Sequence, residues 1–136
     1  MRKIIFYEKP GCDENRKQKD FIAAAGYEIE TRDLTAHHWT PAGLRAFFVD
    51  RPVVDWFDPK AAKVLSGEVN PAAANPQAAL VMMSIDPSLI RSPLIKFNGR
   101  CASGLDAEEL EHFLVAKKRD GSLRPGVKPP EHWSGE

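Results

Sequence analysis

The chain has 136 residues, enough for one domain of ordinary size with its own hydrophobic core. Its 19 basic and 19 acidic residues cancel, so the composition favours neither nucleic acid nor a membrane as a direct partner. No apolar run approaches the roughly 20 residues that span a bilayer, and the first apolar run is too short for an export signal. Two cysteines are too few for a disulfide framework. We therefore expect a cytoplasmic protein with reduced thiols.

The first 34 residues predict a strand, a helix and a second strand. Residues 3–7 are β-branched and aromatic and lead into a Pro-Gly turn. A helical pattern begins at Cys12 and ends at Gly26, a residue type that commonly terminates helices. Residues 27–32 alternate between inward-facing and charged side chains, as in a half-exposed strand. Because one helix joins the two strands, they should be parallel, with a right-handed crossover.

Proline punctuates the middle of the chain. Three pairs place a capping side chain before a proline and so predict helix starts: Thr40-Pro41, Asp58-Pro59 and Asn75-Pro76. Residues 66–75 are rich in Gly, Asn, Pro and Ala and predict a loop. Apolar side chains at helical spacing predict buried stripes, which are Leu44, Phe47 and Phe48, then Ala79, Leu80, Met82, Met83 and Ile85. We interpret the methionines as core packing rather than as a soft metal site.

The last part of the chain predicts a hairpin followed by a helix. A short strand over 94–97 follows Ser92-Pro93, and the Asn98-Gly99 pair is a strong signal for a two-residue turn into residues 100–103. Asp106 and Glu109 have the spacing of a capping box for a helix. The apolar stripe of that helix consists of Leu110, Phe113 and Leu114.

The predicted order is β-α-β, a helical insert, then β-β-α. A parallel pair followed by a hairpin gives a mixed four-stranded sheet with helices on both faces, which is the α/β architecture of thioredoxin. We expect one domain over residues 1–117, with the helical insert at about 40–86. Residues 118–136 are rich in glycine and proline and predict a flexible tail.

Cys12 is the main candidate for chemistry. It follows a strand and a turn and lies at a helix start, where unpaired N–H groups and a partial positive charge favour thiolate over thiol. Lys9, Arg16 and Lys17 add positive charge nearby, whereas the acidic pair at 13–14 raises the pKa of a thiol and so opposes their effect. The alternative is that Cys12 simply fills a turn. No second cysteine stands at position 15, so Cys12 would act as a single thiol or with a distant partner.

The residues around Cys12 carry a resemblance to a known family. The segment Phe6-Tyr7-Glu8-Lys9-Pro10-Gly11-Cys12, with Asn15-Arg16, resembles the arsenate reductase (ArsC)/Spx family of thioredoxin-like proteins. The similarity continues to Asp86-Pro87-Ser88-Leu89-Ile90-Arg91-Ser92-Pro93 and spans about residues 2 to 115. The chain is most similar to the nitrogenase-associated branch of that family.

The resemblance implies roles for particular residues. Cys12 matches the family nucleophile, which attacks arsenate in the reductases. Asn15 falls where the reductases have a serine near the thiolate and where Spx-type members have a second cysteine. Pro93 matches the thioredoxin-fold cis-proline that faces the active-site cysteine.

The chain departs from the family at the arginines that hold the oxyanion. Their positions correspond to Ser92, to Asp58 and to the Ser103-Gly104 segment, none of which is basic. Arg91 lies one residue from the first position and could support the site in its place, as could Arg100 on the hairpin. The departures argue against arsenate reduction, because the oxyanion would lose its fixed donors.

Two further candidates carry weaker signals. Cys101 follows the hairpin turn and could resolve an oxidised Cys12, although we favour a half-buried structural thiol. The adjacent histidines His37 and His38 have no third ligand at useful spacing, so we interpret them as loop residues and expect no metal.

Two functional hypotheses remain open. In the first, the chain is a monothiol oxidoreductase that uses Cys12, binds no resident cofactor and takes glutathione or a glutaredoxin as co-substrate. In the second, the scaffold is a non-enzymatic adaptor, either Spx-like in contact with the transcription machinery or an accessory to nitrogenase assembly. Loss of function on Cys12→Ser would support the first hypothesis.

Overall fold

The computed structural model of the protein describes residues 3–49 and 51–116. The strands are β1 (Lys3–Glu8), β2 (Glu28–Asp33), β3 (Leu94–Phe97) and β4 (Arg100–Ser103). The α-helices are α1 (Asp13–Ala24), α2 (Pro41–Arg45), α3 (Ala62–Leu65), α4 (Pro76–Ile85) and α5 (Ala107–Ala116). Short 3-10 turns are η1 (Ala46–Phe48), η2 (Val53–Trp56), η3 (Pro71–Ala73) and η4 (Pro87–Leu89). The predicted tail at 118–136 lies outside the described residues.

The strands form a mixed four-stranded sheet in the order β2-β1-β3-β4, which confirms the predicted α/β class. β1 and β2 are parallel, while β3 is antiparallel to both of its neighbours. Asn98 and Gly99 make the predicted hairpin turn with φ of 51° and 78°, the left-handed values that a two-residue turn requires. The β-α-β start and the β-β-α end therefore enclose the insert, as the pattern predicted.

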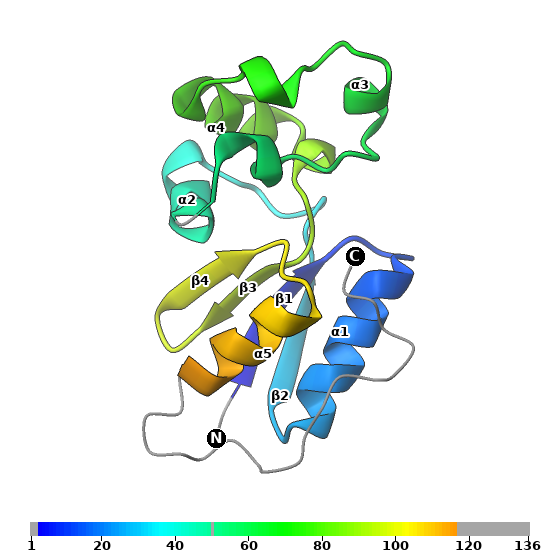
Figure 1. Cartoon of the computed structure of the whole chain (residues 1–136), viewed down its shortest axis with the longest axis vertical. Coiled ribbons are helices and arrows are strands. Elements are labelled where there is room, and N and C mark those ends of the chain that lie inside the picture. The colour runs from blue at the N-terminus through cyan, green and yellow to red at the C-terminus, as the bar shows by residue number, and fades with distance from the viewer. Residues whose placement is uncertain (1–2, 50, 117–136) are drawn as a thin grey trace.

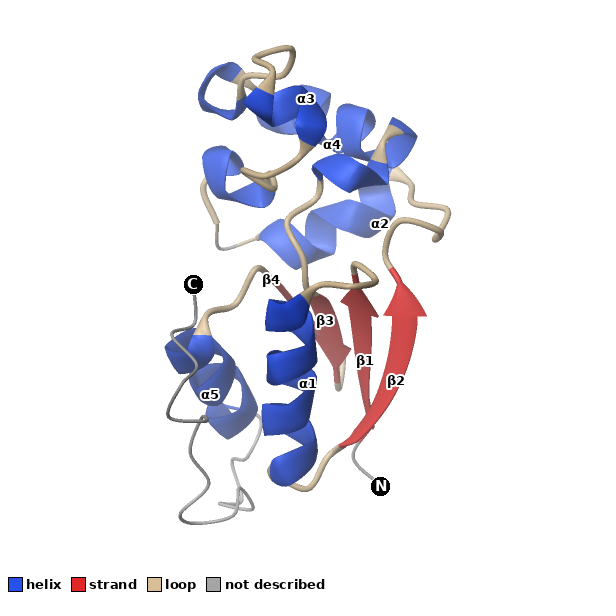
Figure 2. Cartoon of the chain, turned by 90° about the vertical axis from the view of Figure 1, so that its right-hand side faces the viewer, coloured by secondary structure: helices blue, strands red, loops and turns tan. Residues whose placement is uncertain are grey.

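The alternating side chains of the strands divide the core into two clusters. Ile4, Phe6 and Ile95 face α1 and α5, which cover one side of the sheet in Figure 2. Tyr7 and Leu94 face the other way and pack with apolar residues of the insert. The insert lies beyond one end of the strands (Figure 1). No helix in the described part of the chain is long and apolar enough to cross a lipid bilayer.

Most of the predicted helix ends are confirmed. Thr40 and Asn75 cap α2 and α4 by accepting the N–H groups of Gly43 and Ala78. Before α5, the Asp106 carboxylate accepts the N–H of Glu109 at 2.8 Å and the Glu109 carboxylate accepts the N–H of Asp106 at 3.0 Å, which completes the predicted capping box.

Two predictions in the insert are wrong. No helix starts at Asp58-Pro59, because the Asp58 carboxylate bonds the N–H of Lys60 in a tight turn, and α3 begins only at Ala62. Ile85 belongs to the predicted stripe of α4 but is the last residue of that helix and is 77% exposed. The predicted loop over 66–75 is confirmed, with the short turn η3 as its one regular piece.

Candidate active site

Cys12 lies at the junction of β1 and α1, as predicted. A backbone bond of 3.1 Å from the Cys12 N–H to the Lys9 carbonyl closes the turn that precedes the helix. Cys12 is the N-cap residue of the 12-residue helix α1, and its Sγ accepts the N–H of Asn15 at 3.4 Å. The thiol is half-buried. A helix-end N–H therefore points at the sulfur, an arrangement that stabilises negative charge on it.

Asn15 holds this turn in place. Its side chain is 1% exposed, its Oδ1 accepts the backbone N–H of Lys9 at 3.0 Å, and its Nδ2 donates to Gln18 at 3.0 Å. Gln18 is also buried and donates to the Leu105 carbonyl at 2.7 Å. This chain of amides joins the Cys12 turn to the segment before α5. Asn15 thus positions Cys12 through the backbone, a role that the sequence alone did not indicate.

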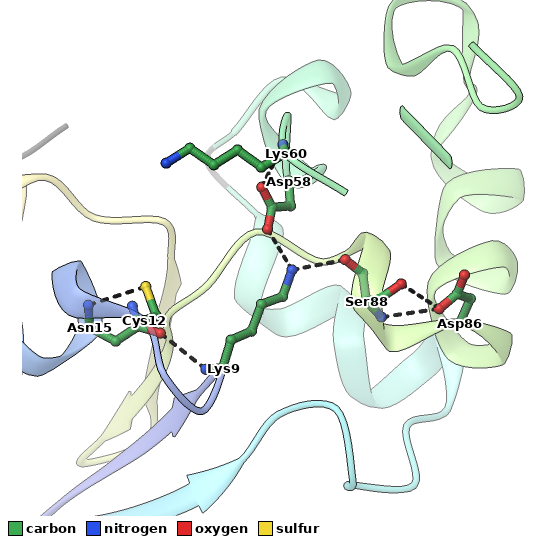
Figure 3. A network of polar contacts seen from close by, with 7 residues as sticks. All are labelled: Lys9, Cys12, Asn15, Asp58, Lys60, Asp86 and Ser88. Atoms are coloured by element: carbon green, nitrogen blue, oxygen red, sulfur yellow. Dashed lines mark hydrogen bonds and ion pairs between the residues drawn. The ribbon is translucent and has the colours of Figure 1, made fainter. Parts of the chain in front are cut away.

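Lys9 connects the same turn to the insert (Figure 3). Its Nζ donates to Asp58 Oδ2 at 2.6 Å and to the carbonyl of Ser88 at 2.8 Å. Both partners of the ion pair are only about one-fifth exposed, at 19% for Lys9 and 20% for Asp58. Lys9, which was expected to add positive charge near Cys12, therefore forms an ion pair with a carboxylate instead.

The predicted arginines lie elsewhere. Arg16 is exposed on α1 and pairs with Asp13 at 3.3 Å. The stem of Arg91 crosses Gly104, where an added Cβ would come within 3.1 Å of its Cδ. Among the described residues, no hydrogen bond or ion pair joins either arginine to Cys12.

Pro93 lies at the expected end of the sheet. Leu94 is level with Tyr7 in the antiparallel register, so Pro93 stands beside the end of β1 that leads to Cys12. The Ser92–Pro93 peptide bond is cis, as the resemblance implied.

The side chain of Cys101 lies on the face of the sheet that α1 and α5 do not cover. It is level with Lys96 on β3 and packs against the cluster that contains the insert residues. Burial raises the pKa of its thiol, and the nearby Lys96 only partly offsets this. Cys101 is level with Lys96, which pairs with Ile5 inside β1. Cys12 lies beyond the end of β1, at the start of α1, so the two thiols stand at different levels of the sheet. This geometry gives the proposed resolving role no support.

The adjacent histidines differ in burial, since His37 is partly buried and His38 is exposed. His37 packs against Trp39 in a tilted arrangement and against Tyr7 edge-on, with ring centroids 4.2 and 5.2 Å away. Burial lowers the pKa of His37, and the positive charges of Arg32 and His38 lower it further. In residues 3–49 and 51–116, no group of three or more His, Cys, Asp or Glu side chains is placed to hold a metal ion.

Comparisons with known proteins agree with this fold. An uncharacterized 15.7 kDa protein in the draG 3′ region of Rhodospirillum rubrum is 40% identical over 114 residues, which is 84% of this chain and 80% of that protein. An arsenate reductase from Vibrio cholerae superposes with a TM-score of 0.67 at 16% identity, over 84% of this chain and 97% of that one. An arsenate reductase (ArsC) related protein from Brucella melitensis superposes with a TM-score of 0.60 at 16% identity, covering 82% and 94%. No family model matches the chain.

Proposed function

This chain belongs to the family of the Rhodospirillum rubrum protein and has the thioredoxin-like fold of the ArsC proteins, and on that premise we propose that it is a single-cysteine thiol oxidoreductase. The observation that carries the proposal is the position of Cys12. Its half-buried sulfur caps α1 and accepts a backbone N–H, in a turn fixed by the buried Asn15. A helix-end thiol in such a turn is suited to nucleophilic attack.

The proposed substrate is a mixed disulfide rather than an oxyanion. Reduction of arsenate needs fixed cationic donors around the anion. Lys9, the cation in the turn before Cys12, is paired with Asp58, and the Asp58 carboxylate would repel an anion. A neutral disulfide sulfur does not need such donors, so the charge pattern favours disulfide exchange.

The exchange runs in two steps with glutathione as reductant. The Cys12 thiolate attacks the glutathione sulfur of a glutathionylated thiol, the disulfide breaks, and the substrate leaves as its thiolate. A second glutathione thiolate then attacks the glutathione sulfur of the Cys12 mixed disulfide and releases Cys12 as thiolate. The products are the reduced substrate and oxidised glutathione. No resolving cysteine is required.

The test uses the mixed disulfide of glutathione and 2-mercaptoethanol, with glutathione as reductant. We expect Cys12→Ser to lower the rate by about 100-fold or more, because a hydroxyl is a poor nucleophile at neutral pH. Cys101→Ser is the matched control and should stay within about twofold of the parent. Arsenate in the same assay should give no turnover that depends on Cys12. An unchanged rate in Cys12→Ser would rule out the proposal.

A second candidate is the non-enzymatic adaptor. It is favoured by the observation that two of the three cations expected to activate Cys12, Lys9 and Arg16, have carboxylate partners. Because the sequence resembles the nitrogenase-associated branch, we propose nitrogenase assembly as the first place to look for a partner, with the transcription machinery second. A partner that is retained equally by the parent and by Cys12→Ser, together with no exchange activity, would support this candidate instead.

A further inference from the structure

A cavity runs along the outer edge of β4. Its volume is about 370 Å³, and its floor is formed by the residues of β4. One wall comes from the insert with Phe47, Val49 and Arg51, and the other comes from α5 with Glu109, His112 and Phe113. Cys12 does not line it. We call this cavity the β4 groove.

The backbone of β4 faces the β4 groove. β4 is the last strand in the sheet order, and in the described part of the chain no strand pairs with its outer side (Figure 1). The turn at 98–99 makes Phe97 and Arg100 a hydrogen-bonded pair, and hydrogen-bonded and non-bonded pairs alternate along an antiparallel ladder. The Gly104 N–H bonds the Pro93 carbonyl at 2.9 Å, in agreement with that alternation. The N–H and C=O groups of Cys101 and Ser103 therefore point outward, away from β3.

Ser103 adds an unsatisfied polar group at the same place. It lines the β4 groove and is 2% exposed, yet its hydroxyl has no hydrogen-bond partner among the described residues. An enclosed polar group without a partner costs free energy that a bound partner can recover. In the described residues, the outer edge of β4 and the Ser103 hydroxyl thus both lack a hydrogen-bond partner in the β4 groove.

The walls indicate the chemistry of that partner. Val49 is 75% exposed and offers apolar contact, whereas Phe47 and Phe113 line the β4 groove as buried core residues, each 5% exposed. The guanidinium of Arg100 lies 4.8 Å from the centre of the Phe113 ring, and no carboxylate in the described residues pairs with it. Arg51 is paired with Glu109 at 2.8 Å. One arginine therefore remains uncompensated, which favours an acidic partner.

We propose that the β4 groove binds an extended, acidic peptide segment of a partner protein, which adds to the sheet as a fifth strand next to β4. Outward N–H and C=O groups supply the ladder, and the two walls receive alternate side chains. This proposal goes beyond the thiol chemistry at Cys12 and stands independently of it.

Other occupants fit less well. Residues 117–136 of this chain contain five basic and three acidic residues, as well as three prolines that cannot donate to a ladder. A second copy would pair β4 with β4 and would bring the walls of one β4 groove against the same walls of the other. A single acidic strand meets neither difficulty.

Binding is tested with the full chain and a fluorescein-labelled octapeptide of alternating valine and glutamate. We expect saturable anisotropy, at least about tenfold weaker for the matching valine-lysine peptide. Arg100→Glu should weaken binding of the acidic peptide by about tenfold or more, whereas Lys60→Glu, at an exposed site in the insert, should leave it unchanged. Hydrogen exchange at the amides of Cys101 and Ser103 should slow in the complex.

A proline substitution tests the strand addition directly. Cys101→Pro removes an outward N–H that β3 does not use, so it should abolish binding, while Cys101→Ala should retain it. If Cys101→Pro fails to fold, the hydrogen exchange and Arg100→Glu decide the matter. The proposal is overturned by no saturable binding up to about 1 mM peptide. It is also overturned by binding that Arg100→Glu leaves unchanged, by binding that requires removal of residues 117–136, or by dimerisation through β4 without peptide.

Discussion

At the scale of single residues, the packing of His37 links the protonation of its imidazole to the stability of the fold. Its ring lies among Tyr7 and Trp39, close to the guanidinium of Arg32, which itself lies 5.8 Å from the centre of the Tyr7 ring. Partial burial and the neighbouring positive charge both oppose protonation, so the pKa of His37 is lowered. Protonation of His37 must then weaken the folded state.

We predict that His37→Phe reduces the loss of stability in mild acid. As pH falls below about 6.5, the ordinary histidine pKa, the unfolded chain takes up a proton before the folded chain does. The free energy of unfolding therefore decreases from that pH down to the lowered pKa of the folded state. Urea titrations between about pH 7.5 and 5 measure the effect, and phenylalanine keeps the ring packing while removing the charge.

The control for this prediction is a nearby exposed residue without a titratable group, in the variant Ala36→Ser. It should retain the pH dependence of the parent, because carboxylates that titrate in the same range are common to all three proteins. Equal pH dependence in His37→Phe and the parent would show that His37 is protonated as easily in the folded chain as in the unfolded one.

At the scale of elements, Lys9 fastens the turn before α1 to two separate segments of the insert. Asp58 follows η2, and the carbonyl of Ser88 comes from η4, so one ammonium group joins three pieces of chain (Figure 3). The Asp58 carboxylate also bonds the N–H of Lys60, which fixes its own orientation. This contact holds the insert over the start of α1.

We predict a measurable coupling between Lys9 and Asp58. In a double-mutant cycle with Lys9→Met and Asp58→Asn, the interaction should be about 1 kcal/mol, since both side chains are largely buried. Asparagine retains the oxygen that caps the N–H of Lys60. The free energies of unfolding in urea give the coupling, which should shrink in about 1 M salt.

A more exposed ion pair supplies the comparison. Lys3 and Glu30 are 3.4 Å apart, with about half of the lysine side chain exposed. Their coupling, measured in the same way, should be close to zero because solvent screens the pair. If the two cycles give the same value, the contact between Lys9 and the insert contributes no more than an ordinary surface pair.

Elements that depend on near neighbours could be predicted from the sequence. The caps at Thr40 and Asn75, the capping box before α5 and the hairpin turn all involve partners within about three residues. Asp58-Pro59 has the same local signature, but its carboxylate is drawn into a turn and an ion pair instead. Local signals therefore predict an element only where no distant group competes for the same atoms.

In the candidate site, too, the local features could be predicted from the sequence and the long-range contacts could not. The position of Cys12 at a helix start was visible from a strand, a turn and a helical pattern. The partners of Lys9 lie 49 and 79 residues away, and no periodicity signals such contacts. The amide chain from Asn15 through Gln18 to Leu105 crosses a similar separation. Buried asparagine and glutamine on the apolar side of a predicted helix are the signal that could have suggested it.

At the scale of the whole molecule, the sheet and the insert share one core. The cluster that contains Phe48 and Trp56 from the insert also contains Tyr7 and Leu94 from the sheet. Phe48 is almost fully buried and stacks on Trp56, with ring centroids 4.7 Å apart. Since the insert has no separate core, it should not fold or unfold alone.

We therefore predict one cooperative transition in urea. Tryptophan fluorescence reports on the insert through Trp39 and Trp56 once Trp133 is replaced by phenylalanine, and circular dichroism reports on all elements. The two midpoints should coincide, and Phe48→Ala should lower both together by about 3–5 kcal/mol of stability. Val54→Ala, at a half-exposed position, should change the free energy of unfolding by about 0.5 kcal/mol or less. A fluorescence transition at lower urea than the circular dichroism transition would show that the insert is a separate folding unit, because loss of the shared core would then leave the sheet intact.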